Sequence, residues 1–192
     1  MGLPALKWED LPHYTYDDYK KWEGQWEIIN GIPYAMAPTP TKKHQWVSAK
    51  IITQLTHLLE KCGNCTAFIP VDWKITPDTV VQPDVSVVCG ESLEGKTLDN
   101  VPVLVFEILS PSTARKDRVL KYQLYENAGV KYYCIVDPEN NCVEAFTLGG
   151  KGYGDKESFR DGKMVFNLGE CSIAFDFAQI FKPSTGGVSL IK

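Results

Sequence analysis

Residues 101–109 restrict the possible folds of this chain more than any other stretch. They read VPVLVFEIL, a run that is apolar except for Glu107. A strand of this kind is buried on both faces and lies in the middle of a sheet. A helical pattern follows over 115–128, Gly129 ends it, and 130–136 is a second apolar strand. Because a strand, crossover helix and strand form a right-handed unit, we predict a parallel strand pair at the centre of the sheet.

The rest of the chain supplies further strands and one long helix. Asn30-Gly31 is the strongest two-residue turn signal and predicts a hairpin over 26–36. Apolar residues recur at helical spacing over 41–61, and Gly63 follows. We also predict a short helix at 15–22 and strands at 66–70, 73–76, 84–89, 142–148, 164–168 and 172–175. The predicted fold is α/β, a mixed β-sheet flanked by helices, in a single domain over the 192 residues.

Charge and hydropathy exclude some classes of protein. The net charge of −4 argues against wholesale coating of nucleic acid. Two segments are locally basic, 38–59 with three lysines and 114–121 with the sequence ARKDRVLK, and these are either phosphate contacts near a site or ordinary solvated helix faces. No apolar run approaches the ~20 residues that span a bilayer, and the first residues do not form a secretory signal. We therefore expect a cytoplasmic protein without membrane contact.

The cysteines are expected to be reduced, because no export signal is present. Cys89 and Cys134 lie in apolar, strand-like runs and are interpreted as small core residues. Cys62 and Cys65 form a CGNC motif, but no second pair has the spacing of a zinc site. We interpret the motif as a helix end followed by a turn.

Glu107 and Asp84 are the first two candidate site residues. A carboxylate in the apolar strand of Glu107 needs a partner, because an unpaired buried charge is too costly. A bound cation is one solution, and a salt bridge or a protonated acid are the others. Asp84 opens a second strand, and side chains from neighbouring strands converge where strands end. Two carboxylates together make an oxygen-rich site that suits Mg²⁺.

Lys121 is the third candidate. On a helical wheel of 116–128, Asp117 and Lys121 fall in the middle of the apolar arc, so this helix directs both at the sheet. Because the helix follows the strand of Glu107, Lys121 is expected to reach the same cleft. Asp117 lies one helical turn away and is expected to position Lys121. The three groups suit phosphodiester hydrolysis, and a structural ion-pair network is the alternative.

The sequence resembles the bacterial Uma-two family of endonucleases, a branch of the PD-(D/E)XK nuclease superfamily. The resemblance covers about 12–180, the predicted core, and implies a restriction-endonuclease-like fold. The matching stretches are WEIINGIPYAM (26–36), TKKHQ (41–45), QPDVSVVC (82–89), FEILSPST (106–113) and DRVLKYQLYENAGVKYYCIVDP (117–138).

The resemblance implies a role for each site residue. Asp84 matches the metal-binding aspartate, and Glu107 matches the second acid, with the Ile108 carbonyl as a further ligand. Leu109 stands where the plain motif has lysine, and Lys121 matches a lysine relocated to the following helix. Glu27 resembles the acid that the superfamily supplies from an early element, and a surface strand acid is the alternative.

His44 faces inward from the start of the long helix, three residues before Val47. It contacts either phosphate or metal-bound water, or it is a hydrogen-bonded core histidine. Together these residues predict a Mg²⁺-dependent endodeoxyribonuclease, with Mn²⁺ as an alternative metal, DNA as substrate and a homodimer by analogy. A catalytically inactive nucleic-acid-binding protein and a dimeric scaffold of the same fold are the rival hypotheses.

Overall fold

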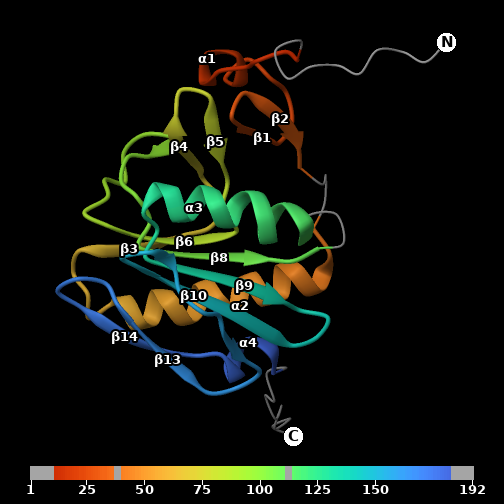
Figure 1. Cartoon of the computed structure of the whole chain (residues 1–192). Coiled ribbons are helices and arrows are strands. Elements are labelled where there is room, and N and C mark those ends of the chain that lie inside the picture. Colours follow the sequence, from red (N-terminus) through yellow and green to blue (C-terminus); the bar gives the residue numbers. More distant parts are fainter. Residues whose placement is uncertain (1–10, 37–39, 111–113, 183–192) are drawn as a thin grey trace, which may run out of the picture.

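A seven-stranded mixed sheet forms the centre of the computed structural model, which describes residues 11–36, 40–110 and 114–182 (Figure 1). Its strands follow the order β11-β10-β9-β8-β6-β3, and β12 pairs with β10. The strands are β3 (Cys65–Phe68), β6 (Val85–Cys89), β8 (Leu104–Ile108), β9 (Tyr132–Asp137), β10 (Cys142–Gly149), β11 (Gly152–Tyr153) and β12 (Glu157–Phe159).

The apolar run around Glu107 lies where the sequence predicts. All five residues of β8 are buried. The strand pairs in parallel with β9, with Leu104 opposite Tyr132, and antiparallel with β6, with Val85 opposite Phe106. Gly129 ends the connecting helix with φ of 86°, a left-handed conformation that glycine adopts without strain. The predicted parallel pair and the α/β class are therefore confirmed.

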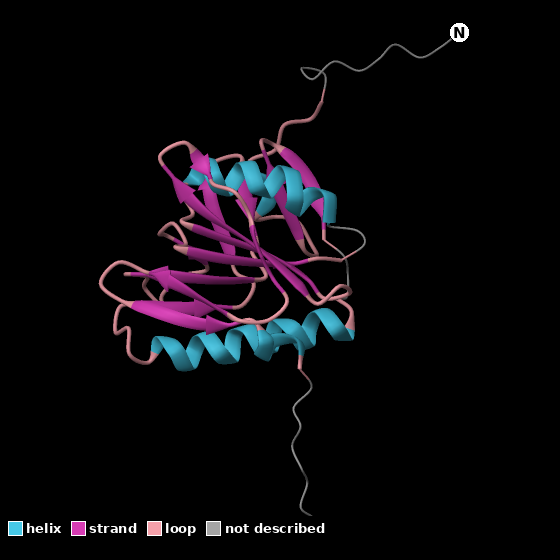
Figure 2. Cartoon of the chain, turned by 60° about the horizontal axis from the view of Figure 1, so that its bottom comes forward, coloured by secondary structure: helices cyan, strands magenta, loops and turns pink. Residues whose placement is uncertain are grey.

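Helices lie on both sides of the strands (Figure 2). On one side, α2 (Lys42–Leu59) buries residues that recur every four positions, Val47, Ile51, Leu55 and Leu59. They pack in one core cluster with the even-numbered residues of β8 and with the hairpin of β13 (Lys163–Asn167) and β14 (Ser172–Asp176). On the other side, α3 (Tyr122–Ala128) buries Tyr125 in a second cluster that includes Val105 of β8.

A second sheet of five strands covers the α3 side, in the order β2-β1-β5-β4-β7. Its hairpin turns at Asn30 and Gly31, whose φ values of 50° and 74° confirm the predicted two-residue turn. β5 and β7 were not expected from the sequence. The strands are β1 (Trp26–Ile29), β2 (Ile32–Ala35), β4 (Asp72–Thr76), β5 (Thr79–Val81) and β7 (Thr97–Leu98). The described residues also form the short helices α1 (Tyr16–Tyr19) and α4 (Ala178–Phe181).

Four cysteines are paired, so the expectation of reduced thiols is wrong for them in this structure. Disulfides join Cys62 to Cys171 and Cys65 to Cys89. The second pair is brought together by strand register, since Cys65 of β3 lies directly opposite Cys89 of β6. Cys134 is a free, buried core residue, as predicted. In the described part of the chain, no helix is both long and apolar enough to cross a bilayer.

The packing of α2 gives a first prediction. Leu55→Ala removes a side chain that is 0% exposed, and we expect it to lower the free energy of unfolding by about 2–5 kcal/mol. Thr53→Ala, at an exposed position of the same helix, is the control and is expected to change it by less than about 0.5 kcal/mol. Urea denaturation followed by circular dichroism measures both, and equal losses would contradict the assigned inner face of α2.

Candidate active site

Alternation along β8 places Glu107 on the α3 side of the central sheet. Phe106 and Ile108 face the α2 cluster, whereas Val105 and Glu107 point the other way. Glu107 is only 3% exposed. A carboxylate at this depth requires partners, and the helix that follows β8 supplies them.

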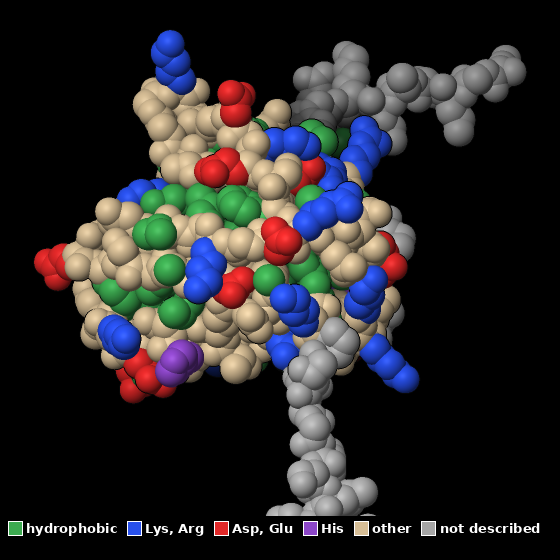
Figure 3. All heavy atoms as spheres, turned by 90° about the horizontal axis from the view of Figure 1, so that it is seen from below, with side chains coloured by type: hydrophobic (Ala, Val, Ile, Leu, Met, Phe, Trp, Pro, Cys, Tyr) green, Lys and Arg blue, Asp and Glu red, His purple; other side chains and the backbone are tan. Residues whose placement is uncertain are grey.

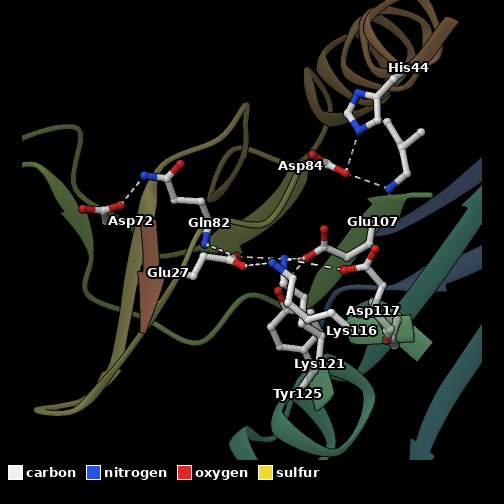
Figure 4. A network of polar contacts seen from close by, with 12 residues as sticks. Glu27, His44, Asp72, Gln82, Asp84, Glu107, Lys116, Asp117, Lys121 and Tyr125 are labelled. Atoms are coloured by element: carbon white, nitrogen blue, oxygen red, sulfur yellow. Dashed lines mark hydrogen bonds and ion pairs between the residues drawn. The ribbon is translucent and has the colours of Figure 1, made fainter. Parts of the chain in front are cut away.

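Lys121 is the common partner of the buried acids (Figure 4). Its Nζ lies 2.7 Å from Glu107 Oε1, 2.9 Å from Glu27 Oε1 and 3.9 Å from Asp117 Oδ1. The Tyr125 hydroxyl donates to the same Glu107 Oε1 at 2.6 Å. The structure therefore brings Lys121 to Glu107, as the helical wheel predicts, and places Asp117 one turn away.

The helix carrying Lys121 differs from the predicted one. Residues Lys116–Lys121 form a π-helical turn, and α-helix resumes at Tyr122–Ala128. In a π-helix the hydrogen bond closes five residues along, so residues five apart lie on nearly the same side. Lys116 and Lys121 consequently both form ion pairs with Glu27. A regular α-helix would separate these two ammonium groups around its axis.

Glu27 comes from the second sheet and is fully buried. Its Oε1 accepts the backbone N–H of Gln82 at 3.0 Å, while Oε2 pairs with Lys116. The alternative that Glu27 is a surface acid is therefore wrong. Glu27 ties β1 and the residue after β5 to the π-helical turn, so the two sheets and the helix meet at one polar cluster.

Asp84 and His44 form the more exposed edge of the site. Asp84 Oδ2 accepts the Ile108 backbone N–H at 2.7 Å and lies 3.2 Å from His44 Nε2. His44 stands in the first turn of α2, where Thr41 Oγ1 accepts its backbone N–H at 3.2 Å. The side chains of His44 and Asp84 are 13% and 17% exposed, so solvent reaches this edge.

Charge is unevenly distributed in the cluster. The carboxylates of Glu27, Asp84, Glu107 and Asp117 interact with the ammonium group of Lys121, and Lys116 pairs with Glu27. Burial raises the pKa of Glu107 well above its usual range; Lys121 opposes this shift, and the neighbouring Asp84, Asp117 and Glu27 add to it.

Glu27 responds in the opposite direction because it has two cationic neighbours. Burial opposes its ionisation, but Lys121 and Lys116 outweigh that cost and lower its pKa. Burial also disfavours the charged form of Lys121. The negative charges of Glu107, Glu27 and Asp117 outweigh this effect, so the pKa of Lys121 is raised well above its usual 10.5. Of the two glutamates, Glu27 is therefore favoured in its charged form and Glu107 is disfavoured in it.

The donor set fits a small divalent cation. Mg²⁺ takes one or two carboxylates and keeps several waters. Asp84 is held through Oδ2, by the Ile108 N–H and His44, and Glu107 is held through Oε1, by Lys121 and Tyr125. No three His, Cys, Asp or Glu side chains of the described ranges group as ligands, so a site here would depend on these two acids and water.

His44 and Ile108 adjoin this position. Burial lowers the pKa of His44, but hydrogen bonding and charge attraction from Asp84 and a hydrogen bond to the Ile108 backbone outweigh that effect and raise it. His44 is therefore a largely buried, hydrogen-bonded histidine at the edge of the site. The backbone of Ile108, whose carbonyl is the expected ligand, is hydrogen-bonded to it.

Sequence reasoning missed three members of the cluster. Tyr125 lies in the apolar arc of the wheel, and only its hydroxyl, which donates to Glu107, belongs to the site. Lys116 is reached only through the π-helical turn, for which the sequence carries no signal. Gln82 contributes its backbone N–H, and its side chain donates to Asp72 at 2.6 Å.

Comparison with known proteins adds independent findings. Residues 15–168 match the model of the Uma2 family, which is described as "Putative restriction endonuclease". An uncharacterized protein of Synechocystis is 30% identical over 136 residues, which cover 66% of this chain and 70% of the relative. A crystal structure of "a putative nuclease belonging to DUF820" from Anabaena variabilis has a TM-score of 0.70 at 17% identity, over 88% of this chain and 97% of that one. The likeness confirms the restriction-endonuclease-like fold.

Glu107 generates a prediction about pH. Its pKa is higher in the folded than in the unfolded chain, so between the two values the folded state binds more protons and stability rises as pH falls. Glu27 acts oppositely, but its contribution is lost only as pH falls below the unfolded value near 4.5. We expect the free energy of unfolding, measured with a chelator present, to rise by up to about 1.4 kcal/mol per pH unit as pH falls from the raised folded-state pKa of Glu107 toward the unfolded value near 4.5.

Glu107→Gln isolates this effect, because it keeps the shape and removes the titrating group. His44 also has a raised pKa and adds a slope of the same sign, so the measured quantity is the difference between the two slopes. Urea titrations across the pH range give it. Identical slopes in wild type and Glu107→Gln would contradict the raised pKa of Glu107.

Proposed function

This chain belongs to the Uma2 family, and from that premise we propose that it is a metal-dependent endonuclease that hydrolyses phosphodiester bonds of DNA. The observation that carries the proposal is the convergence of Glu107 and Lys121 beside Asp84, in a cluster with more carboxylates than nearby ammonium groups. Mg²⁺ is the proposed metal, with Mn²⁺ as the alternative. Asp84 and Glu107 would hold it, together with the Ile108 carbonyl.

A bound divalent ion polarises a phosphate and lowers the pKa of a coordinated water. The chain's own residues then have separate tasks. Lys121 carries a permanent positive charge toward the place where negative charge develops on the phosphate, which stabilises a transition state. Glu27 and Asp117 hold its ammonium group, and the Tyr125 hydroxyl orients Glu107.

His44 is the residue to which we assign contact with substrate. It lies at the solvent-accessible edge beside Asp84, and its raised pKa increases the fraction that is protonated near neutral pH. A protonated imidazole donates hydrogen bonds to phosphate oxygens. We therefore assign His44 to binding the phosphate next to the scissile bond.

DNA contact in this proposal is local. Arg118 forms an ion pair with Glu144, and Lys116 forms one with Glu27. These two bases of segment 114–121 therefore neutralise acids of the protein itself. On the face seen in Figure 3, Lys and Arg side chains are interspersed with acidic and neutral ones and do not form one continuous basic surface. This distribution suits contacts near the site rather than a broad basic surface. A homodimer is part of the proposal by analogy with the fold.

The first test is cleavage of plasmid, linear duplex and single-stranded DNA with Mg²⁺. We expect Asp84→Asn and Lys121→Met each to lower the rate by about 10²–10³-fold, because each removes a group that stabilises the transition state. Asp161→Asn and Lys156→Met make the same chemical changes at exposed positions and are expected to keep the rate. Cleavage that survives both site variants would refute the assigned site.

Lys121→Met is also expected to cost about 3–5 kcal/mol of stability, because Glu27 and Glu107 lose their shared cation. Asp84→Asn therefore serves as the better-folded variant, since its carboxylate is partly exposed. Circular dichroism of each variant distinguishes a lost fold from a lost reaction.

Metal binding is the second test, and it separates an enzyme from the rival inactive proteins of the same fold. Titration calorimetry should give heat with Mg²⁺ for wild type and little heat for Asp84→Asn. At a metal concentration of about 100 times Kd, wild type should gain about 2.7 kcal/mol of stability. No heat in wild type, or unchanged heat in Asp84→Asn, would favour an inactive nucleic-acid-binding module or scaffold.

A further inference from the structure

Four of the six cysteines gather at one place, away from the carboxylate cluster. Cys62 follows the last turn of α2, and its N–H donates to the Leu59 carbonyl at 2.8 Å. Cys65 begins β3 and Cys89 ends β6, directly opposite each other in the antiparallel ladder. Cys171 immediately precedes β14. All four belong to, or pack against, the core cluster on the α2 side.

The backbone holds these residues as neighbours independently of their sulfur atoms. The Cys65 N–H donates to the Cys62 carbonyl at 3.0 Å, so CGNC forms a tight turn. Cα atoms lie 5.6 Å apart for Cys62 and Cys171 and 3.9 Å apart for Cys65 and Cys89. Leu168 connects the two cysteine pairs. Its carbonyl oxygen lies 3.7 Å from Cys89 Sγ, and the Leu168 N–H donates to the Cys171 carbonyl at 2.7 Å.

This arrangement supplies the second pair of ligands for a zinc site, which cannot be recognised from spacing in the sequence. Structural zinc is held by four thiolates or imidazoles in a tetrahedron, commonly with two ligands from a C-x₂-C turn. CGNC provides that turn, but its partners Cys89 and Cys171 are 24 and 109 residues away along the chain from Cys65 and Cys62. Folding brings them to the two cysteines of the turn, one partner each.

We propose that these four cysteines form a second, sulfur-based metal site, which binds one Zn²⁺ when the two disulfides are reduced. The oxidised form holds no group of three or more metal ligands within the described ranges, because the sulfur atoms are bonded to one another. Zinc and disulfides are thus alternative cross-links of the same residues.

The conversion balances with a dithiol as reductant. Each disulfide takes two electrons and two protons from one dithiol, which becomes a disulfide, so two dithiols yield four cysteine thiols. Zn²⁺ then replaces four protons, because the ligands bind as thiolates. Reoxidation by a disulfide of the same class reverses both steps and releases the metal.

Both forms connect the same four segments: the end of α2, the start of β3, the end of β6 and the turn before β14. The reduced form without metal keeps only the backbone hydrogen bonds between these segments and has no cross-link through sulfur. Zinc therefore keeps this end of the molecule together under conditions that reduce disulfides, and the protein needs no oxidising compartment for its stability.

The test uses the full chain, reduced with a dithiol and transferred without oxygen into Zn²⁺ or Co²⁺ solution. We expect one bound zinc per chain by elemental analysis, and the visible absorption bands of tetrahedral thiolate-bound Co²⁺. Cys62→Ser and Cys89→Ser are expected to lose stoichiometric binding. Cys142→Ser, a free cysteine outside the group, is the matched control and should keep it.

A measurement on wild type covers the case in which a variant fails to fold. A strong chelator should lower the Tm of the reduced, zinc-loaded protein and leave the Tm of the oxidised protein unchanged. Asp84→Asn should behave as wild type here, which separates this site from the carboxylate site. The proposal is overturned if reduced wild type binds no stoichiometric zinc, if Cys62→Ser binds it equally, or if the chelator shifts both Tm values alike.

Discussion

The ion pairs between the buried Lys121 ammonium and the acids around it are the interaction on which the rest of the structure depends. Glu107 comes from the central sheet, Glu27 from the second sheet and Asp117 from the helix itself, and all of them are at most 3% exposed. Taking such charges from water is costly, and replacing them with apolar residues is often neutral or stabilising. The stability of the fold alone therefore does not account for their presence.

The π-helical turn is the local feature that makes this cluster possible. It follows β8 closely and sends two lysines toward Glu27, so that Lys121 is shared with Glu107 while Lys116 compensates Glu27. π-Turns are less favourable than α-helix and occur frequently at functional sites. Here the unusual turn gives Glu27 two cationic neighbours, which lower its pKa, whereas burial raises the pKa of Glu107, which shares Lys121 with Glu27.

Local patterns predict the elements that position the site, but not the contacts that complete it. The apolar run of β8 and the arc of the following helix are visible in the sequence, so the positions of Glu107 and Lys121 follow from periodicity. β5 and β7 are three and two residues long, too short to give a pattern. The sequence also gives no sign that Cys89 and Cys171 are the partners of CGNC. Strand register brings Cys89 to it, and the turn after β13 brings Cys171. The predicted helix was wrong in its first turn, since nothing in ARKDRVLK distinguishes π from α geometry.

One helix joins the two regions of chemical interest. α2 begins with His44 in its first turn, next to Asp84, and Cys62 follows its last turn. Its 18 residues extend over about 27 Å as a stiff rod packed along one side of the central sheet. Any rotation of the rod about its midpoint moves both ends together in opposite directions. A displacement at the sulfur end of this stiff helix would therefore also move the imidazole of His44 relative to the Asp84 carboxylate.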